Sequence, residues 1–144
     1  MKTCLTLIAA VALCGCGLTS NDEIARETLP VTVGLTYNGQ PAPDAVVVFH
    51  PVEKPADGKP AIVPRGVAQP DGSLVISTYA RGDGVPPGEY RLAFSWQGPL
   101  DGLDEDEIDE LAERMPSVYR RPETSGFTLT VSEDAPNEFP PIEL

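Results

Sequence analysis

Short runs in which apolar and polar residues alternate, separated by proline and glycine, constrain the fold of this chain more than any other feature. The clearest alternating run covers residues 90–96, and others lie at 31–37, 74–79 and 127–132; further short β runs lie at 45–50, which is apolar on both faces, and at 65–69 and 138–144. Alternation with a period of two is typical of half-buried β-strands, and the 16 prolines and 13 glycines leave little room for long helices. The chain is therefore predicted to be all-β, with about seven short strands in an antiparallel β-sandwich and Phe94 in its core.

Proline and glycine also predict particular turns and one strand edge. The dipeptide Asn38-Gly39 is a strong hairpin signal, and residues 70–72 (Pro-Asp-Gly) form a tight turn in which glycine supplies a positive φ. Pro140 and Pro141 have no N–H to donate to a neighbouring strand, so the final strand should lie at the edge of a sheet.

One segment departs from the strand pattern and predicts a short inserted α-helix at about residues 104–115. Its apolar residues have the i, i+3, i+4, i+7 spacing of a helical stripe; they are Ile108, Leu111, Ala112 and Met115. Acidic residues at 104–107 would suit the first turn, and Pro116 would stop the helix. Because so short a helix is marginal alone in water, we expect it to pack on the outer face near Val46 and Val48. The alternatives are that it lies across an open end of the sandwich or stands free as a partner-binding arm.

The N-terminus indicates export and attachment to a membrane. Lys2 and the apolar run 5–13 form a signal-like segment that is too short for a transmembrane helix, which needs about 20 apolar residues. It ends in Leu-Cys-Gly-Cys16, which resembles the lipobox of bacterial lipoproteins and implies that Cys16 is acylated, for example with palmitate. A plain secretory signal and a retained hydrophobic tail remain alternatives. We expect a signal peptide at 1–15, a flexible tether at 16–28 and one domain at 29–144.

Charge and cysteine content narrow the location and the partners. The net charge is −12, so nucleic acid is excluded as a partner, and attachment to an anionic membrane must rest on the lipid anchor. The residue after Cys16 is Gly17 and not aspartate, which favours the outer membrane of the cell envelope, facing the periplasm or the cell surface. The three cysteines are Cys4, Cys14 and Cys16, so the mature domain would have no internal disulfide and no thiolate nucleophile.

Four short motifs, in order, resemble the carboxypeptidase regulatory-like (transthyretin-like) domains of small bacterial lipoproteins. They lie at residues 39–47, 69–74, 87–92 and 116–127, and the fourth is similar to a segment of small bacterial lipoproteins that contain this domain. Gln69 and Leu74 depart from the Asp and Phe that are usual in the second motif. The resemblance implies a prealbumin-type fold of seven strands in two sheets, but no single function. Tyr90 of the third motif should pack its ring while its hydroxyl finds a backbone acceptor.

The residues that could carry chemistry have simpler structural interpretations. His50 is the only histidine and should point outward from its strand, so no triad or zinc cluster can be assembled around it. The segment 81–83 spells Arg-Gly-Asp, which we attribute to chance. Tyr79 and Trp96 could form a sugar-stacking platform. The acidic residues near the start of the predicted helix could suggest a calcium site, but their spacing does not match an EF-hand loop. These residues are Asp101, Asp104, Asp106 and Asp109.

The function expected from the sequence is that of a lipid-anchored, non-catalytic module of the bacterial cell envelope. Its role would be protein interaction or structure, with the membrane bound through the anchor and an envelope protein or a glycan as partner. We expect no catalytic, cofactor-binding or metal-binding residues. The alternative is a sandwich that binds a glycan or a small molecule through its end loops.

Overall fold

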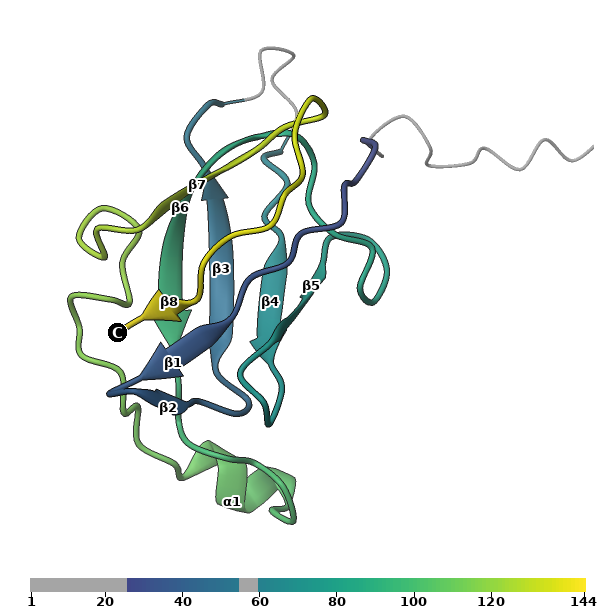
Figure 1. Ribbon diagram of the computed structural model, residues 1–144. Helices are drawn as coiled ribbons and strands as arrows, with labels where there is room; N and C mark the ends of the chain where they lie inside the picture. The colour runs from purple at the N-terminus through teal and green to yellow at the C-terminus, as the bar shows by residue number, and fades with distance from the viewer. Residues whose placement is uncertain (1–25, 55–59) are drawn as a thin grey trace, which may run out of the picture.

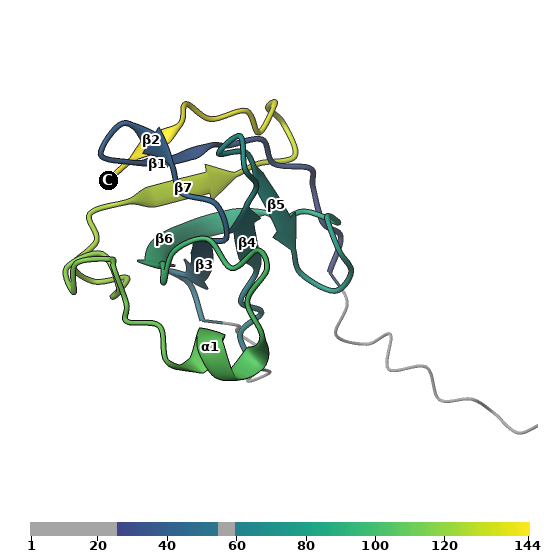
Figure 2. The same ribbon diagram turned by 90° about the horizontal axis from the view of Figure 1, so that it is seen from below.

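The computed structural model describes residues 26–54 and 60–144, which form two β-sheets and almost no helix (Figure 1). The predicted signal peptide, Cys16 and most of the predicted tether lie outside these residues. Seen from below in Figure 2, the two sheets are separate layers that face each other. The prediction of an all-β sandwich is therefore confirmed at this level.

The larger sheet has five strands in the order β5-β4-β3-β6-β7, and all its neighbouring strands are antiparallel. The strands are β3 (Val46–Pro51), β4 (Arg65–Ala68), β5 (Leu74–Ser77), β6 (Gly88–Ser95) and β7 (Thr128–Val131). The alternating run at 90–96 becomes β6, the longest strand. Phe94 is 1% exposed, so its predicted place in the core is confirmed.

The smaller sheet has the order β2-β1-β8, made of β1 (Leu35–Tyr37), β2 (Gln40–Pro41) and β8 (Ile142–Glu143). Asn38 and Gly39 join β1 to β2 with φ values of 50° and 74°, and positive φ at both positions is what a type I′ hairpin turn requires. As the two prolines predicted, β8 lies at a sheet edge. Strand β2 has no counterpart among the strands expected from the sequence.

One strand pair corrects the expectation of a purely antiparallel sandwich, because β1 and β8 are parallel. The reason is the path of the chain in Figure 1. Both β1 and β8 are entered from the end of the sandwich at which β7 finishes, so both run toward the opposite end.

A single hydrophobic cluster joins the two sheets. Leu35 of the small sheet is buried together with Val47, Phe49 and Leu92 of the large sheet. Tyr90 is 4% exposed, and its hydroxyl donates a 2.8 Å hydrogen bond to the carbonyl of Pro86, as its motif predicted. Burial raises the pKa of this hydroxyl.

The inserted helix is much shorter than predicted. Helix α1 covers only Glu105–Asp109, and the rest of the predicted helix is not helical. Beyond α1 the backbone turns back to β6, where the N–H of Arg114 donates to the carbonyl of Trp96, and Met115 enters the core at 3% exposure. Glu110 and Leu111 still donate their N–H groups to Asp106 and Ile108, and the contacts with β6 take the place of helical bonds from Arg114 onward.

The helix is not docked over Val46 and Val48, and its position is closer to the alternative at an open end of the sandwich. None of the residues of α1 is buried; the helix lies past one end of the sandwich (Figure 1), on the side of the large sheet that faces away from the small sheet (Figure 2). The chain that approaches Val46 on the outer face is the loop around Leu100, whose N–H donates to the carboxylate of Asp44. A loop therefore covers part of this face.

The two sheets are joined along the side that carries β5. Leu29 and Val85 exchange two backbone hydrogen bonds, and Leu74 N–H donates to the carbonyl of Val33. Gly84 makes this approach possible, because a Cβ on it would lie 2.0 Å from the carbonyl oxygen of Leu29. This side of the sandwich is therefore closed by the segment that leads into β1.

Candidate functional site

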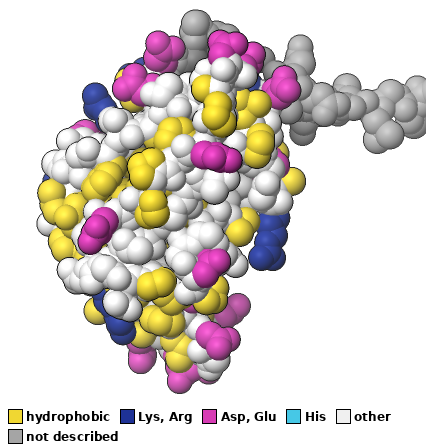
Figure 3. Space-filling view, viewed as in Figure 1, with side chains coloured by type: hydrophobic (Ala, Val, Ile, Leu, Met, Phe, Trp, Pro, Cys, Tyr) yellow, Lys and Arg dark blue, Asp and Glu magenta, His cyan; other side chains and the backbone are white. Residues whose placement is uncertain are grey.

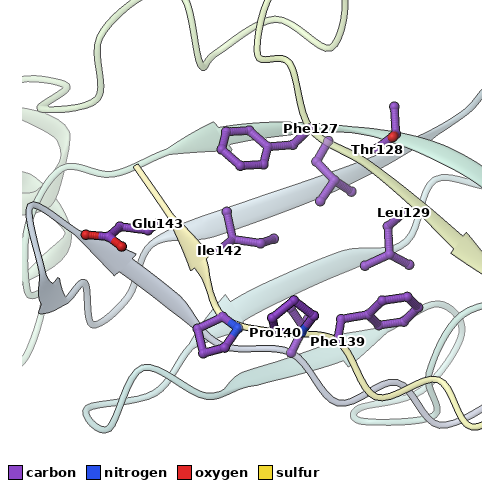
Figure 4. A pocket seen from close by; sticks show the side chains of 10 residues that line it. Phe127, Thr128, Leu129, Phe139, Pro140, Ile142 and Glu143 are labelled. Atoms are coloured by element: carbon purple, nitrogen blue, oxygen red, sulfur yellow. The ribbon is translucent and has the colours of Figure 1, made fainter.

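The opposite side of the sandwich contains a groove between the edge strands β7 and β8, which we call the β7–β8 groove (Figure 4). Its volume is about 230 Å³. Its lining residues are Val33, Leu92, Phe127, Thr128, Leu129, Phe139, Pro140, Pro141, Ile142 and Glu143. A second hollow of about 250 Å³ lies between β1 and the turn at residues 71–73, but the β7–β8 groove is the one bordered by an edge strand of each sheet, so it is taken as the candidate site.

The apolar walls of the groove follow from strand alternation and ring packing. Leu129 is 6% exposed and faces inward from β7, whereas Thr128 and Thr130 face outward and are exposed. Phe127, just before β7, packs edge-on against Phe94 with 5.4 Å between ring centroids. Ile142 of β8 is 9% exposed and forms part of the opposite wall, as Figure 4 shows.

The backbone of β7 leaves hydrogen-bonding groups free beside this groove. Leu92 N–H donates to the carbonyl of Phe127. In an antiparallel ladder only every second residue bonds to a given neighbour. In β7, Leu129 and Val131 therefore bond to β6, and the N–H and C=O groups of Thr128 and Thr130 point toward the free edge.

Just after the end of β7, the backbone hydrogen-bonding groups on this same edge are paired with a side chain. The N–H of Ser132 donates to the amide oxygen of Asn137 at 3.0 Å, and the Asn137 amide nitrogen donates to the carbonyl of Ser132 at 3.1 Å. The side-chain amide thus binds Ser132 as the peptide group of a neighbouring strand would. Within the described residues, no such partner is found for Thr128 or Thr130.

The other border of the groove offers fewer free backbone groups, because in β8 only those of Glu143 face away from β1. In β8, Ile142 and Leu144 donate their N–H groups to β1, at Gly34 and Thr36. Pro140 and Pro141 have no N–H at all. Of the two strands beside the groove, β7 is therefore the one with more free donors and acceptors.

The charge near the groove is negative. Glu143 is exposed and lies at one end of the groove in Figure 4. In Figure 3, hydrophobic side chains gather over the region of β8 with an acidic side chain among them, and the basic side chains on this face stand apart from one another. A basic ligand therefore suits this surface better than an acidic one.

The residues that the sequence suggested as candidates for chemistry do not line the β7–β8 groove. His50 is half-buried in β3 opposite Arg91 of β6, on the face away from the buried Val47 and Phe49, as its alternation predicted. Within residues 26–54 and 60–144, no three His, Cys, Asp or Glu side chains come together in a way that could hold a metal ion. Cys16 lies outside the described residues, so its lipidation remains a prediction.

The acidic segment that begins at Asp104 forms the N-terminus of α1, as predicted from the sequence. Asp104 is the N-cap and accepts the N–H of Glu107 at 2.9 Å, while the Glu107 carboxylate accepts the N–H of Asp104 at 3.0 Å. This capping box uses the acids to satisfy free N–H groups of the helix. Asp101 lies outside this arrangement and is exposed.

The Arg-Gly-Asp segment is not free to present its carboxylate. Asp83 accepts hydrogen bonds from the N–H groups of Thr78, Tyr79 and Ala80, at 2.7 to 3.0 Å. Burial alone would raise the pKa of this carboxyl, but the three donors outweigh it and lower the pKa below its usual 3.8. The aspartate therefore holds its own loop together.

The proposed sugar platform does not form. Trp96 follows the end of β6, and Tyr79 follows the opposite end of the sheet beyond β5. The indole N–H of Trp96 donates to the carbonyl of Pro43, and the guanidinium of Arg114 lies over its ring at 5.6 Å. The two aromatic side chains cannot bind one sugar together.

Comparisons with protein-family models, curated proteins and solved structures give no match for this chain. The part of the chain that the structure describes contains no helix that is long and apolar enough to cross a membrane. Any statement about function therefore rests on the residues themselves.

The β7–β8 groove was not among the sites expected from the sequence. The prolines at 140 and 141 correctly predicted an edge strand, and the alternation at 127–132 correctly predicted β7. That these two edges border one groove depends on the order of strands in space, for which the sequence has no local signal.

Proposed function

We propose that this protein is a lipid-anchored, non-catalytic module of the bacterial cell envelope that binds another envelope protein through the β7–β8 groove. The observation that carries the proposal is the combination of apolar walls with free backbone groups on Thr128 and Thr130. Exposed strand edges are sites at which other chains pair. The lipobox-like sequence ending at Cys16 supports the anchor and the envelope location.

Membership of the carboxypeptidase regulatory-like domains is part of the same proposal. It is supported by the turn at Gly72, with φ 84°, and by the hydroxyl of Tyr90, which is bonded to Pro86 just before β6. Both features suit a structural role for these motifs. The alternative of glycan binding by end loops has no support from Tyr79 and Trp96, which lie at opposite ends of the sheet.

Crosslinking in intact cells tests the interaction. A photoreactive side chain placed at Thr128 should form adducts with an envelope protein, and the same group at Val67 should not. Val67 is a suitable control because it is 41% exposed, on the outer face of the inner strand β4. Identical adducts from both positions would overturn the assignment of the groove.

The anchor is tested separately by metabolic labelling with a palmitate analogue. The wild type should be labelled, and the variant Cys16→Ser should not. Label that survives in Cys16→Ser would contradict the lipoprotein assignment, whatever the result of the crosslinking.

A further inference from the structure

We propose that the partner presents an extended basic segment that adds to β7 as a sixth strand of the large sheet. This inference deepens the proposed function, on which it rests, by naming the form and chemistry of the bound segment. Its backbone would bond to Thr128 and Thr130, and every second side chain would enter the β7–β8 groove. Strand addition of this kind takes its affinity from main-chain hydrogen bonds and its specificity from the side-chain pockets.

The size of the groove favours side chains over a whole small molecule. Sites for small ligands typically have volumes of about 300–1,000 Å³. The groove is smaller, at about 230 Å³, and it runs along a strand edge. Apolar side chains from an added strand would complete the contact between the two sheets at this side, as the segment near Leu29 does at the other.

The hydrogen bonds of the Ser132 backbone show that this edge accepts a peptide-like partner. The Asn137 amide occupies the position of a neighbouring peptide group and exchanges two hydrogen bonds with the Ser132 backbone. Thr128 and Thr130 are the preceding residues on the same edge. An added strand would continue the pattern that Asn137 begins.

Charge favours a basic segment over a second copy of this chain. Glu143 lines the groove, and the whole chain has a net charge of −12. Two copies that paired edge to edge would bring like charges together, whereas the negative net charge attracts a basic segment. The Lys or Arg side chains of an added strand would point to the outer face of the large sheet, away from the apolar groove. The expected ligand therefore alternates apolar residues with Lys or Arg.

The test uses the full chain in detergent and a short synthetic peptide in which Val and Lys alternate. Binding should protect the amides of Thr128 and Thr130 from hydrogen exchange and weaken as salt is added. The variant Thr130→Pro removes one free N–H while keeping the bonds to β6, so it should weaken binding about tenfold. The control variant is Val67→Ala, at an exposed strand position away from β7, and it should bind the peptide as the wild type does. Ser73→Pro would not serve as a control, because it would remove an N–H that is bonded to Asp71.

Two kinds of result would overturn the addition of a partner strand to β7. The first is the absence of binding, or binding that is unchanged in Thr130→Pro. The second is a dimer in ultracentrifugation that Thr130→Pro converts to a monomer, which would assign the edge to a second copy. A peptide in which Val and Glu alternate should bind the wild type more weakly than the Val–Lys peptide does; equal binding of the two peptides would contradict the basic ligand.

The proposal and the proposed function can fail independently. Peptide binding without crosslinks from Thr128 in cells would support strand addition and contradict the role in the envelope. Crosslinks from Thr128 that persist in Thr130→Pro would support an envelope interaction and contradict strand addition.

Discussion

At the scale of single residues, several polar groups act by completing hydrogen bonds of the backbone. Asn137 pairs with Ser132, and Tyr90 with Pro86. The carboxylate of Asp83 binds three N–H groups of its own loop. Such bonds to a charged acceptor are stronger than neutral ones and make the loop sensitive to acid.

The first prediction concerns this acid sensitivity. Because the pKa of Asp83 is lowered in the folded state, its contribution to stability is present above the unfolded value of 3.8 and is lost as the pH falls through the folded value. Asp83→Asn should cost about 1 kcal/mol at neutral pH, since the site is partly exposed. Its difference from the wild type should shrink below pH 3.8, as measured by denaturant unfolding.

The control for Asp83 is Asp101→Asn. Asp101 is exposed, and its carboxylate accepts no hydrogen bond within the described residues. This variant should unfold as the wild type does at neutral pH. Equal losses in the two variants would contradict a special role for Asp83.

At the scale of elements, the segment after β6 shows how tertiary contacts limit a helix. The stripe from Ile108 to Met115 has helical spacing, yet α1 ends at Asp109. Glu113 accepts the N–H groups of both Trp96 and Met115, which holds the chain against the end of β6. Burying Met115 in the core stabilises this path more than an exposed helical turn would.

The second prediction separates the two ends of this stripe. Met115→Ala should cost about 2–5 kcal/mol, because it leaves a cavity in the core. Ile108→Ala, in a helix without buried residues, should cost less than about 1 kcal/mol. Thermal or denaturant unfolding measures both variants, and similar losses would indicate a continuous docked helix.

At the scale of the whole molecule, the two long sides of the sandwich differ. On the β5 side, backbone bonds between Leu29 and Val85 close the gap between the sheets. On the β7 side, the gap remains as the β7–β8 groove. The asymmetry leaves one strand edge available to a partner and protects the other.

The third prediction concerns the closed side. Gly84→Ala should cost at least about 2 kcal/mol, because it adds strain at a positive φ and places a Cβ against the carbonyl of Leu29. Gly102 is a matched control, with a φ of 80° and no atom within 4 Å of its would-be Cβ. Gly102→Ala should cost only about 1 kcal/mol, from strain alone. Equal costs would mean that the contact with Leu29 does not matter to the fold.

The sequence by itself determined the local structure of this protein. Alternation placed β6 and buried Phe94, and Asn38-Gly39 specified a hairpin turn because both residues accept a positive φ. The missing N–H groups of Pro140 and Pro141 put β8 at an edge. These outcomes depend on neighbouring residues and on backbone chemistry, so they can be predicted without knowledge of the fold.

Only the tertiary structure decided how these pieces meet. The parallel pairing of β1 with β8 joins Thr36 to Glu143, and the end of α1 depends on the contact of Arg114 with Trp96. The β7–β8 groove likewise exists because strands distant in sequence become the edges of facing sheets. Such contacts are set by the packing of the whole core, which no short window of the sequence contains.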